Sequence, residues 1–146
     1  MSSVVTRSAE ETIERGRELA AKMRAPLLVL LSGELGAGKT TLAKGMISGL
    51  GAAAEEEITS PTFTLVHTFT GPVKIFHVDL YRVEGVQEFD SLGLEDIFAE
   101  PAIVFVEWPE RMRMRTDWPV MRIELEHAGE DERRIAVSDV KKVASG

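Results

Sequence analysis

One glycine-rich segment constrains the fold of this chain more than any other feature of its sequence. Gly33-Glu34-Leu35-Gly36-Ala37-Gly38-Lys39-Thr40 has the spacing G-x-x-x-x-G-K-S/T. The apolar residues 27–31 before it predict a buried strand, and residues 40–50 after it have apolar positions at helical spacing. A strand, a glycine turn and a helix in this order are typical of an α/β fold that binds phosphate at the turn.

The glycines and the lysine of this segment suit the binding of phosphate. A backbone that binds an anion through its amides must turn tightly and approach it closely, which Gly33, Gly36 and Gly38 permit. The positive end of the next helix attracts the anion, Lys39 adds a mobile cation, and Thr40 offers a hydroxyl to Mg²⁺. We therefore predict a nucleotide site. Its predicted contacts in this segment are Glu34, Leu35, Gly36, Ala37, Gly38, Lys39, Thr40 and Thr41.

Two acidic residues come at the ends of predicted strands. Asp79 follows Ile-Phe-His-Val, and Glu107 follows another apolar run. Strand ends border the ligand crevice of an open α/β sheet, so we expect both carboxylates beside the phosphates, with Lys39. One would hold Mg²⁺ with Thr40, and the other would orient or deprotonate water. The alternative interpretation of each acid is a simple charge at a strand end.

Two further features are candidates for nucleotide contact. Residues 60–62 (Ser-Pro-Thr) precede the next predicted strand, and their hydroxyls, including that of Thr62, would sense Mg²⁺ or phosphate in a switch-like loop. The alternative is that they only open the strand. Trp108 would stack on the nucleotide base or anchor a partner protein, unless it belongs to the core.

The histidines and one arginine-rich stretch have weaker signals. Three histidines lack the spacing of metal ligands, and we interpret them as structural: His67, His77 and His127. Arg111, Arg113 and Arg115 alternate with methionine. They are candidates for clamping phosphate, contacting RNA or binding an acidic protein face, but an exposed turn is the favoured interpretation.

The whole pattern predicts one α/β domain over residues 1–146, a P-loop NTPase domain with a mixed sheet flanked by helices. Ser8 and Glu11 fit a capping box for a first helix that continues to about Met23. The other predicted elements are a hairpin at 63–79, one or two short helices at 86–98 interrupted near Gly93, a buried strand at 102–107 and a C-terminal antiparallel hairpin at 121–137.

Composition narrows the class of protein. The chain has no cysteine, which excludes disulfides and thiolate chemistry. Its longest apolar run, residues 25–31, is far shorter than the roughly 20 residues that cross a bilayer, and the first residues do not form a signal peptide. A formal charge of −7 repels a nucleic-acid backbone on average. We therefore expect a cytoplasmic protein without membrane contact.

Three classes of protein share the glycine-rich segment. A switch GTPase reads guanine with Asn-Lys-x-Asp, and the absence of asparagine excludes that form. A small-molecule kinase needs an arginine-bearing lid, for which residues 111–115 are the only candidate. The third class is a nucleotide-driven accessory factor that acts on a partner protein, in a form that hydrolyses the nucleotide or in one that only senses it. The kinase and both accessory forms remain open from the residues alone.

Four segments, in order, resemble the TsaE family, also called YjeE. They are Gly-Glu-Leu-Gly-Ala-Gly-Lys-Thr-Thr at 33–41, Ser-Pro-Thr-Phe-Thr-Leu-Val at 60–66, His-Val-Asp-Leu-Tyr-Arg at 77–82 and Val-Glu-Trp-Pro-Glu at 106–110. The resemblance runs from about residue 8 to residue 110, and the remainder matches only as a hairpin.

The resemblance implies an ATP-binding, weakly hydrolysing protein of tRNA threonylcarbamoyladenosine biosynthesis. Its expected partners are the TsaB and TsaD proteins, with tRNA reached only through the complex. By motif, Lys39 would contact phosphates, Thr40 and Glu107 would hold Mg²⁺, and Asp79 would be an active-site carboxylate near the metal. Thr62 would belong to the switch-like loop and Trp108 would lie beside the site. The nucleotide base would lie near the start of the first helix.

Overall fold

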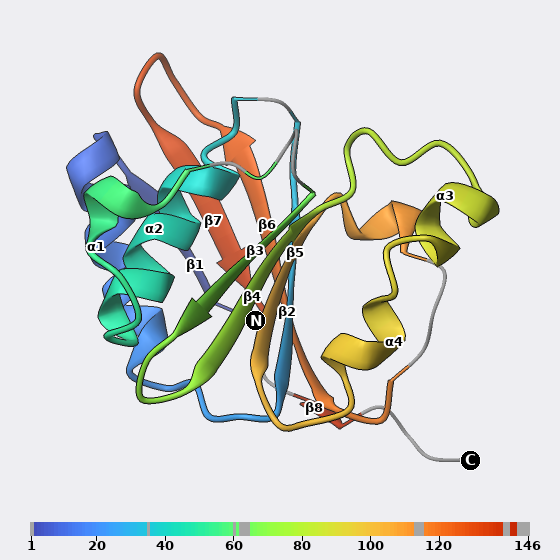
Figure 1. The fold of residues 1–146 in the computed structure, drawn as a ribbon. Coiled ribbons are helices and arrows are strands. Elements are labelled where there is room, and N and C mark those ends of the chain that lie inside the picture. Colours follow the sequence, from blue (N-terminus) through green and yellow to red (C-terminus); the bar gives the residue numbers. More distant parts are fainter. Residues whose placement is uncertain are drawn as a thin grey trace.

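A mixed β-sheet crosses the molecule and has helices on both faces (Figure 1). The computed structural model describes residues 2–34, 36–59, 61, 65–112, 116–138 and 141–142. The strands are β1 (Ser2–Thr6), β2 (Leu27–Ser32), β3 (Val66–Thr70), β4 (Lys74–Asp79), β5 (Ile103–Glu107), β6 (Pro119–His127), β7 (Arg133–Val137) and β8 (Lys141–Lys142). The helices are α1 (Ala9–Ala20), α2 (Lys39–Gly49), α3 (Val86–Asp90) and α4 (Leu94–Ile97), with 3₁₀ turns η1 (Glu55–Glu57) and η2 (Pro109–Arg111).

The centre of the sheet is parallel and its margins are antiparallel. Within the described residues the strand order is β1-β7-β6-β2-β5-β4-β3, and β8 pairs with β6. Strand β2 pairs in parallel with β5 and β6, and β4 pairs in parallel with β5. The carboxyl ends of β2, β4 and β5 therefore meet at one edge of the sheet.

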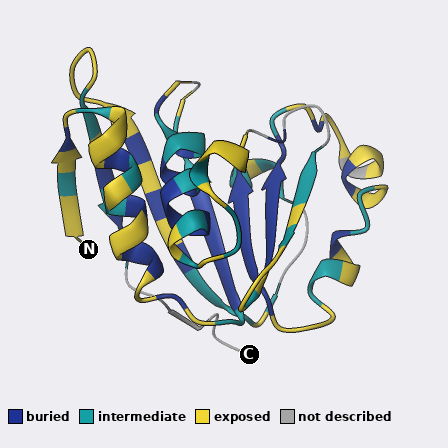
Figure 2. Cartoon of the chain, turned by 60° about the vertical axis from the view of Figure 1, so that its left-hand side comes forward, coloured by how far each residue is buried: buried dark blue, intermediate teal, exposed yellow. Residues whose placement is uncertain are grey.

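Burial on both faces explains why β2 has no polar residue before its last position. Leu27, Val29 and Leu31 pack into the core under α1 and α2, whereas Leu28 and Leu30 pack into the core under α3 and α4. Successive side chains of a strand point to opposite faces, so a strand covered on both sides must be continuously apolar. The central strands in Figure 2 are accordingly buried almost throughout.

Helices α1 and α2 approach each other backbone to backbone through glycines. A Cβ atom at Gly16 would lie 2.5 Å from the carbonyl oxygen of Leu42, and one at Gly45 would overlap the carbonyl oxygen of Ile13. No larger residue fits either position without moving a helix. The close contact fixes α2, and therefore the loop that precedes it, relative to α1.

The start of α1 has the predicted side-chain cap, with one difference. The Ser8 hydroxyl accepts a hydrogen bond from the Glu11 amide at 3.1 Å, as the capping box requires. The Glu11 carboxylate accepts in return from the Arg7 amide, at 3.1 Å, one residue before the cap. These two hydrogen bonds satisfy backbone amides at the amino end of the helix that would otherwise lack partners.

Most of the predicted elements are confirmed. The α/β class, the mixed sheet flanked by helices, the buried strands at 27–31 and 102–107, and the two short helices separated at Gly93 all occur. The hairpin of β3 and β4 also occurs, although residues 62–64 lie outside the described part.

The structure differs from the prediction at the first helix and adds pairings that the sequence did not predict. The first helix ends at Ala20, and a turn rather than further helix brings Met23 back to the core. The C-terminal antiparallel hairpin is confirmed as β6 and β7, and β6 also pairs in parallel with β2 in the centre of the sheet. Strand β1 was not predicted; it pairs with β7 at the sheet margin.

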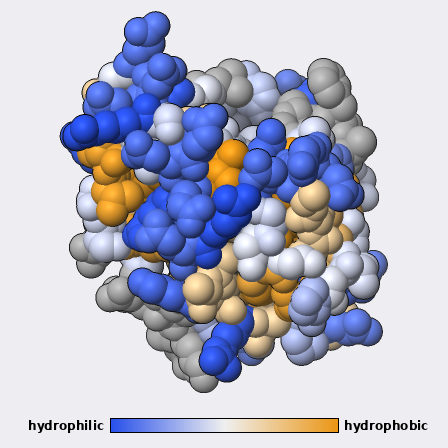
Figure 3. Space-filling view, turned by 90° about the vertical axis from the view of Figure 1, so that its left-hand side faces the viewer, coloured by the Kyte–Doolittle hydropathy of each residue, from blue (hydrophilic) through white to orange (hydrophobic). Residues whose placement is uncertain are grey.

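The surface over α1 is mainly hydrophilic. Figure 3 shows that hydrophobic residues on this face lie in small separate patches. Among the described residues, none of the helices is both long and apolar enough to cross a membrane.

The glycine contact predicts a large loss of stability from one added methyl group. Replacing Gly45 by alanine should lower the free energy of unfolding by about 1–3 kcal/mol or more, because the new Cβ overlaps the Ile13 carbonyl. Gly85→Ala is the matched control, since a Cβ there meets nothing within 4 Å; at this helix cap its cost should be ~1 kcal/mol or less. Urea denaturation compares the two, and equal losses would contradict the contact.

Candidate functional site

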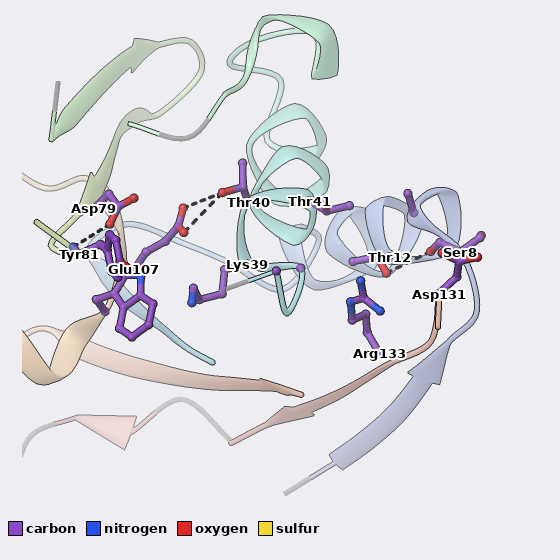
Figure 4. Close-up of a pocket in the computed structure, with 14 residues that line it drawn as sticks. Ser8, Thr12, Lys39, Thr40, Thr41, Asp79, Tyr81, Glu107, Asp131 and Arg133 are labelled. Carbon is purple, nitrogen blue, oxygen red and sulfur yellow. Dashed lines mark hydrogen bonds between the residues drawn. The ribbon is translucent and has the colours of Figure 1, made fainter. Parts of the chain in front are cut away.

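A cavity of about 330 Å³ opens at the edge where the carboxyl ends of β4 and β5 meet the start of α2 (Figure 4). The residues that line the cavity gather at two ends in Figure 4. Asp79, Tyr81 and Glu107 lie at one, and Ser8, Thr12, Asp131 and Arg133 lie at the other, with the glycine-rich loop and the start of α2 between them. The cavity is therefore elongated, with acidic residues at the sheet end and mixed polar residues at the α1 end.

The loop between β2 and α2 has a backbone that its glycines permit. Gly36 and Gly38 have φ angles of 77° and 99°, in the left-handed region that side chains disfavour. Gly38 directly precedes α2, and no side chain caps the amides of the first helical turn. These amides, at the positive end of the helix, form a site suited to an anion.

Lys39 is the buried cation beside the glycine-rich loop, in the middle of the cavity. Its ammonium donates hydrogen bonds to the carbonyls of Gly33 and Glu34 and lies 4.0 Å from the ring centroid of Trp108. Burial lowers the pKa of Lys39 below its ordinary value, and the carboxylates of Glu107, Asp79 and Glu110 oppose this shift. Among the described residues, the lysine thus contacts two neutral carbonyls of its own loop and a neighbouring ring, within reach of an anion in the cavity.

Two buried carboxylates lie side by side at the sheet end. Asp79 is opposite Glu107 in the parallel pairing of β4 and β5, and their exposed fractions are 2% and 3%. Asp79 accepts a hydrogen bond from the Tyr81 amide at 2.9 Å. Glu107 accepts from the Thr40 hydroxyl at 3.2 Å and contacts the His77 imidazole at 2.6 Å. Two adjacent buried anions repel each other, and a cation between them would offset that repulsion.

The donors at this end fit Mg²⁺ in company with a phosphate ligand. A hydroxyl and carboxylate oxygens are hard ligands of the kind Mg²⁺ prefers, and Mg²⁺ commonly uses only one or two protein carboxylates beside phosphate oxygens. Among the described residues no group of three or more His, Cys, Asp or Glu side chains could hold a metal alone. The residues that fit are Thr40, Glu107 and Asp79.

The segment after β5 and the segment after β4 are tied together. Trp108 has a left-handed backbone, with φ of 61°, and its ring lies 5.0 Å from that of Tyr81. Arg111 donates hydrogen bonds to the carbonyls of Tyr81, at 2.6 Å, and Val83, at 2.9 Å. The predicted exposed turn is therefore wrong for Arg111, which is half-buried and holds backbone. Arg113 and Arg115 lie outside the described residues.

Polar side chains at the start of α1 and in the β6–β7 turn form the other end of the cavity. Thr12 is buried and donates its hydroxyl to the Ser8 carbonyl at 3.1 Å. Arg133 donates to the carbonyl of Glu132 at 2.9 Å, and its side chain passes beside Gly38. The sequence did not assign Thr12 or Arg133 to the site. Arg133 is distant from α1 in the sequence, and the two come together only because β7 pairs with β1 in the sheet.

The structure brings most of the predicted site residues together. The predicted residues that line the cavity are Gly36, Gly38, Lys39, Thr40, Thr41, Asp79, Glu107 and Trp108. Glu34 accepts from Lys39 through its carbonyl, and Ala37 is buried within the loop. Leu35 and Thr62 lie outside the described residues.

The contact between His77 and Glu107 was also not predicted from the sequence. His77 was interpreted as a structural histidine without a stated partner. A signal was present, because this residue is a polar interruption of the apolar run Ile-Phe-His-Val before Asp79. The run alone does not show which side chain of another strand it faces.

The pKa of Lys39 can be measured directly. In a ¹³C NMR titration of the ligand-free protein, Lys39 should deprotonate below the usual lysine range, because burial outweighs its neighbouring carboxylates. In Glu107→Gln the midpoint should fall further, since one opposing charge is gone. Between the lowered and the ordinary pKa the unfolded chain binds more protons, so this group makes stability rise with pH. A wild-type midpoint at or above the ordinary value would contradict the assignment.

Comparison with known proteins shows which family this chain resembles. The family model described as threonylcarbamoyl adenosine biosynthesis protein TsaE matches residues 6–135. Proteins named tRNA threonylcarbamoyladenosine biosynthesis protein TsaE are similar: that of Treponema pallidum is 34% identical over 92% of this chain and 98% of its own length, and that of Bacillus subtilis 35% identical over 92% and 84%.

A solved structure agrees with the sequence comparison. The crystal structure of Bacillus subtilis YdiB matches with a TM-score of 0.66 and 31% identity, covering 92% of this chain and 82% of that one. The family model covers most of the chain, and the Treponema pallidum protein aligns over nearly its full length. This chain therefore belongs to the TsaE family of threonylcarbamoyl adenosine biosynthesis proteins.

Proposed function

We propose that this chain is a Mg²⁺-dependent ATPase that serves tRNA threonylcarbamoyladenosine biosynthesis. One observation carries the proposal: an uncapped helix start behind a glycine loop shares a cavity with Lys39 and with the Thr40–Glu107 contact. Membership of the TsaE family supports the pathway. The anion-binding loop and the oxygen donors support a nucleotide with its metal ion.

The phosphates of ATP or ADP would lie along the glycine-rich loop. We assign this contact to Glu34, Leu35, Gly36, Ala37, Gly38, Lys39, Thr40 and Thr41. Lys39 would leave the carbonyls of Gly33 and Glu34 for the phosphates, because a charged acceptor binds an ammonium more strongly than a neutral one. The base would occupy the end near Ser8 and Thr12, which the length of the cavity supports.

Thr40 and Glu107 would hold Mg²⁺, with Asp79 beside them. When bound, Mg²⁺ would offset negative charge on the phosphates. Lys39 and the loop amides would stabilise the charge that develops as water attacks the γ-phosphate in line, and Asp79 would orient that water. Trp108 covers the Lys39 side of the cavity. Thr62 would complete the site from the loop that leads to Leu65, whose carbonyl accepts from the Asp79 amide at 2.9 Å.

The partners that we propose are the TsaB and TsaD proteins of the synthase, with tRNA bound only through them. The net charge of −7 supports contact with protein rather than directly with tRNA. Residues 1–146 would act as one domain, because strands from both ends of the chain complete the same sheet.

The role of Lys39 tests the proposal. Lys39→Ala should weaken ATP binding by more than tenfold, since it removes the buried cation beside the glycine-rich loop. The variant should not support repeated threonylcarbamoyl-tRNA formation with purified TsaB, TsaD and the activated threonylcarbamoyl donor. Lys22→Ala is the control, because Lys22 is an exposed lysine outside the cavity and its loss should leave both activities unchanged. Undiminished multi-turnover modification by Lys39→Ala would contradict the proposed role.

Partner binding should depend on the nucleotide. Immobilised wild-type protein should retain TsaB and TsaD to different extents with ATP and with ADP, measured by pull-down of the purified proteins. The Asp79→Ala variant, if slow in hydrolysis, should keep its ATP response without converting to the ADP response. Equal retention with ATP, with ADP and without nucleotide would count against nucleotide control of the partners.

A further inference from the structure

A histidine lies in the interior of the molecule, one strand away from the proposed metal ligand. His77 is in the middle of β4, and its side chain has an exposed fraction of 0%. Its neighbours Phe76 and Val78 pack into the core under α3 and α4. By the alternation of a strand, His77 therefore points to the opposite face, the one that carries α2 and the cavity.

Strand register brings this imidazole to Glu107. His77 pairs with Phe105 and Asp79 pairs with Glu107 across β4 and β5, so His77 and Glu107 are diagonal neighbours on one face. Nε2 of His77 lies 2.6 Å from Oε2 of Glu107. A carboxylate can only accept a hydrogen bond, so this contact requires the hydrogen on Nε2.

Packing alone does not account for a histidine at this position. Within the described residues, Nδ1 of His77 is buried and has no hydrogen-bond partner. A buried polar atom without a partner costs free energy that an apolar side chain of similar size would avoid. The contact with Glu107 is therefore what the imidazole provides and an apolar residue would not.

The same carboxylate oxygen also receives the hydroxyl that the nucleotide loop supplies. Oε2 of Glu107 accepts from the Thr40 hydroxyl at 3.2 Å and lies 2.6 Å from Nε2 of His77. Two donors from two different elements restrict rotation of a side chain that would otherwise have several rotamers. The carboxylate is thereby held with its oxygens toward the start of α2.

We propose that His77 is a positioning residue, which holds the Glu107 carboxylate in the orientation that Mg²⁺–ATP binding requires. The inference rests on the proposed function, because it takes Glu107 as a metal ligand. Groups that orient metal ligands commonly contribute tenfold to a hundredfold to metal affinity. His77 is not among the residues that line the cavity, so it would act through Glu107.

The experiment compares four proteins: wild type, His77→Leu, His77→Gln and His67→Leu. The amide of glutamine reaches about as far as Nε2 of histidine and can donate the same hydrogen bond, whereas leucine fills space without donating. His67 is the matched control, because it lies opposite His77 on β3. Among the described residues, the side-chain hydrogen bonds of the Glu107 carboxylate are with Thr40 and His77 and do not involve His67. Binding of a non-hydrolysable ATP analogue is measured by calorimetry, with Mg²⁺ and with a chelator.

In His77→Leu, affinity for the analogue with Mg²⁺ should fall about tenfold or more, while affinity in the chelator should change less than about twofold. His77→Gln and His67→Leu should stay within about threefold of wild type under both conditions. Circular dichroism and thermal unfolding establish that each variant folds. Equal Mg²⁺ dependence in His77→Leu and wild type would overturn the inference, and so would a loss in His77→Gln as large as that in His77→Leu.

A second readout needs neither a variant nor a ligand. Long-range ¹H–¹⁵N NMR of the wild-type protein, free of metal and nucleotide, should show a hydrogen of His77 on Nε2. A hydrogen only on Nδ1 would overturn the inference. Failure of the proposed function has a different signature, because the wild-type protein would then not bind the analogue with Mg²⁺ at all, whatever the state of His77.

Discussion

The register between β4 and β5 is the constraint on which the rest of the site depends. It sets Asp79 opposite Glu107 and places His77 one diagonal step away, all on the face that α2 covers. A shift of one residue would turn every side chain of one strand to the other face and would place charges in the core under α3 and α4. The apolar residues that alternate with these groups, such as Phe76 and Val106, hold the register in place.

The buried charges of the cavity show how a stable fold can retain a site that is costly to maintain. Lys39 is desolvated, and Asp79 and Glu107 stand side by side with little access to water. None of these groups is needed to complete the core, and buried charges are retained at the expense of stability. Each is the terminal residue of a regular element: Lys39 begins α2, Asp79 ends β4 and Glu107 ends β5. Their arrangement is therefore prepared before any ligand arrives, which reduces the reorganisation that binding requires.

The sequence predicts the elements with a strong local signal and misses those that depend on distant pairing. The apolar residues before Gly33 and those before Glu107 each predict a buried strand. Strands β2 and β5 and the loop between β2 and α2 were therefore correctly predicted. Strand β1 has only five residues, most of them exposed, and its place comes from pairing with residues 133–137. The contact of His77 and the two backbone bonds of Arg111 likewise join segments about thirty residues apart. Residue identity indicates such partners only when the register is known.

The close approach of α1 and α2 has a consequence for the dimensions of the cavity. One end of the cavity is formed by the start of α1, and the middle by the start of α2. Because Gly16 and Gly45 bring the two backbones into contact, these helices cannot slide past each other without a steric clash. The distance between the start of α1 and the start of α2 is therefore fixed. The helix contact thus sets the length of ligand that can span the cavity, although the contact lies outside the cavity lining.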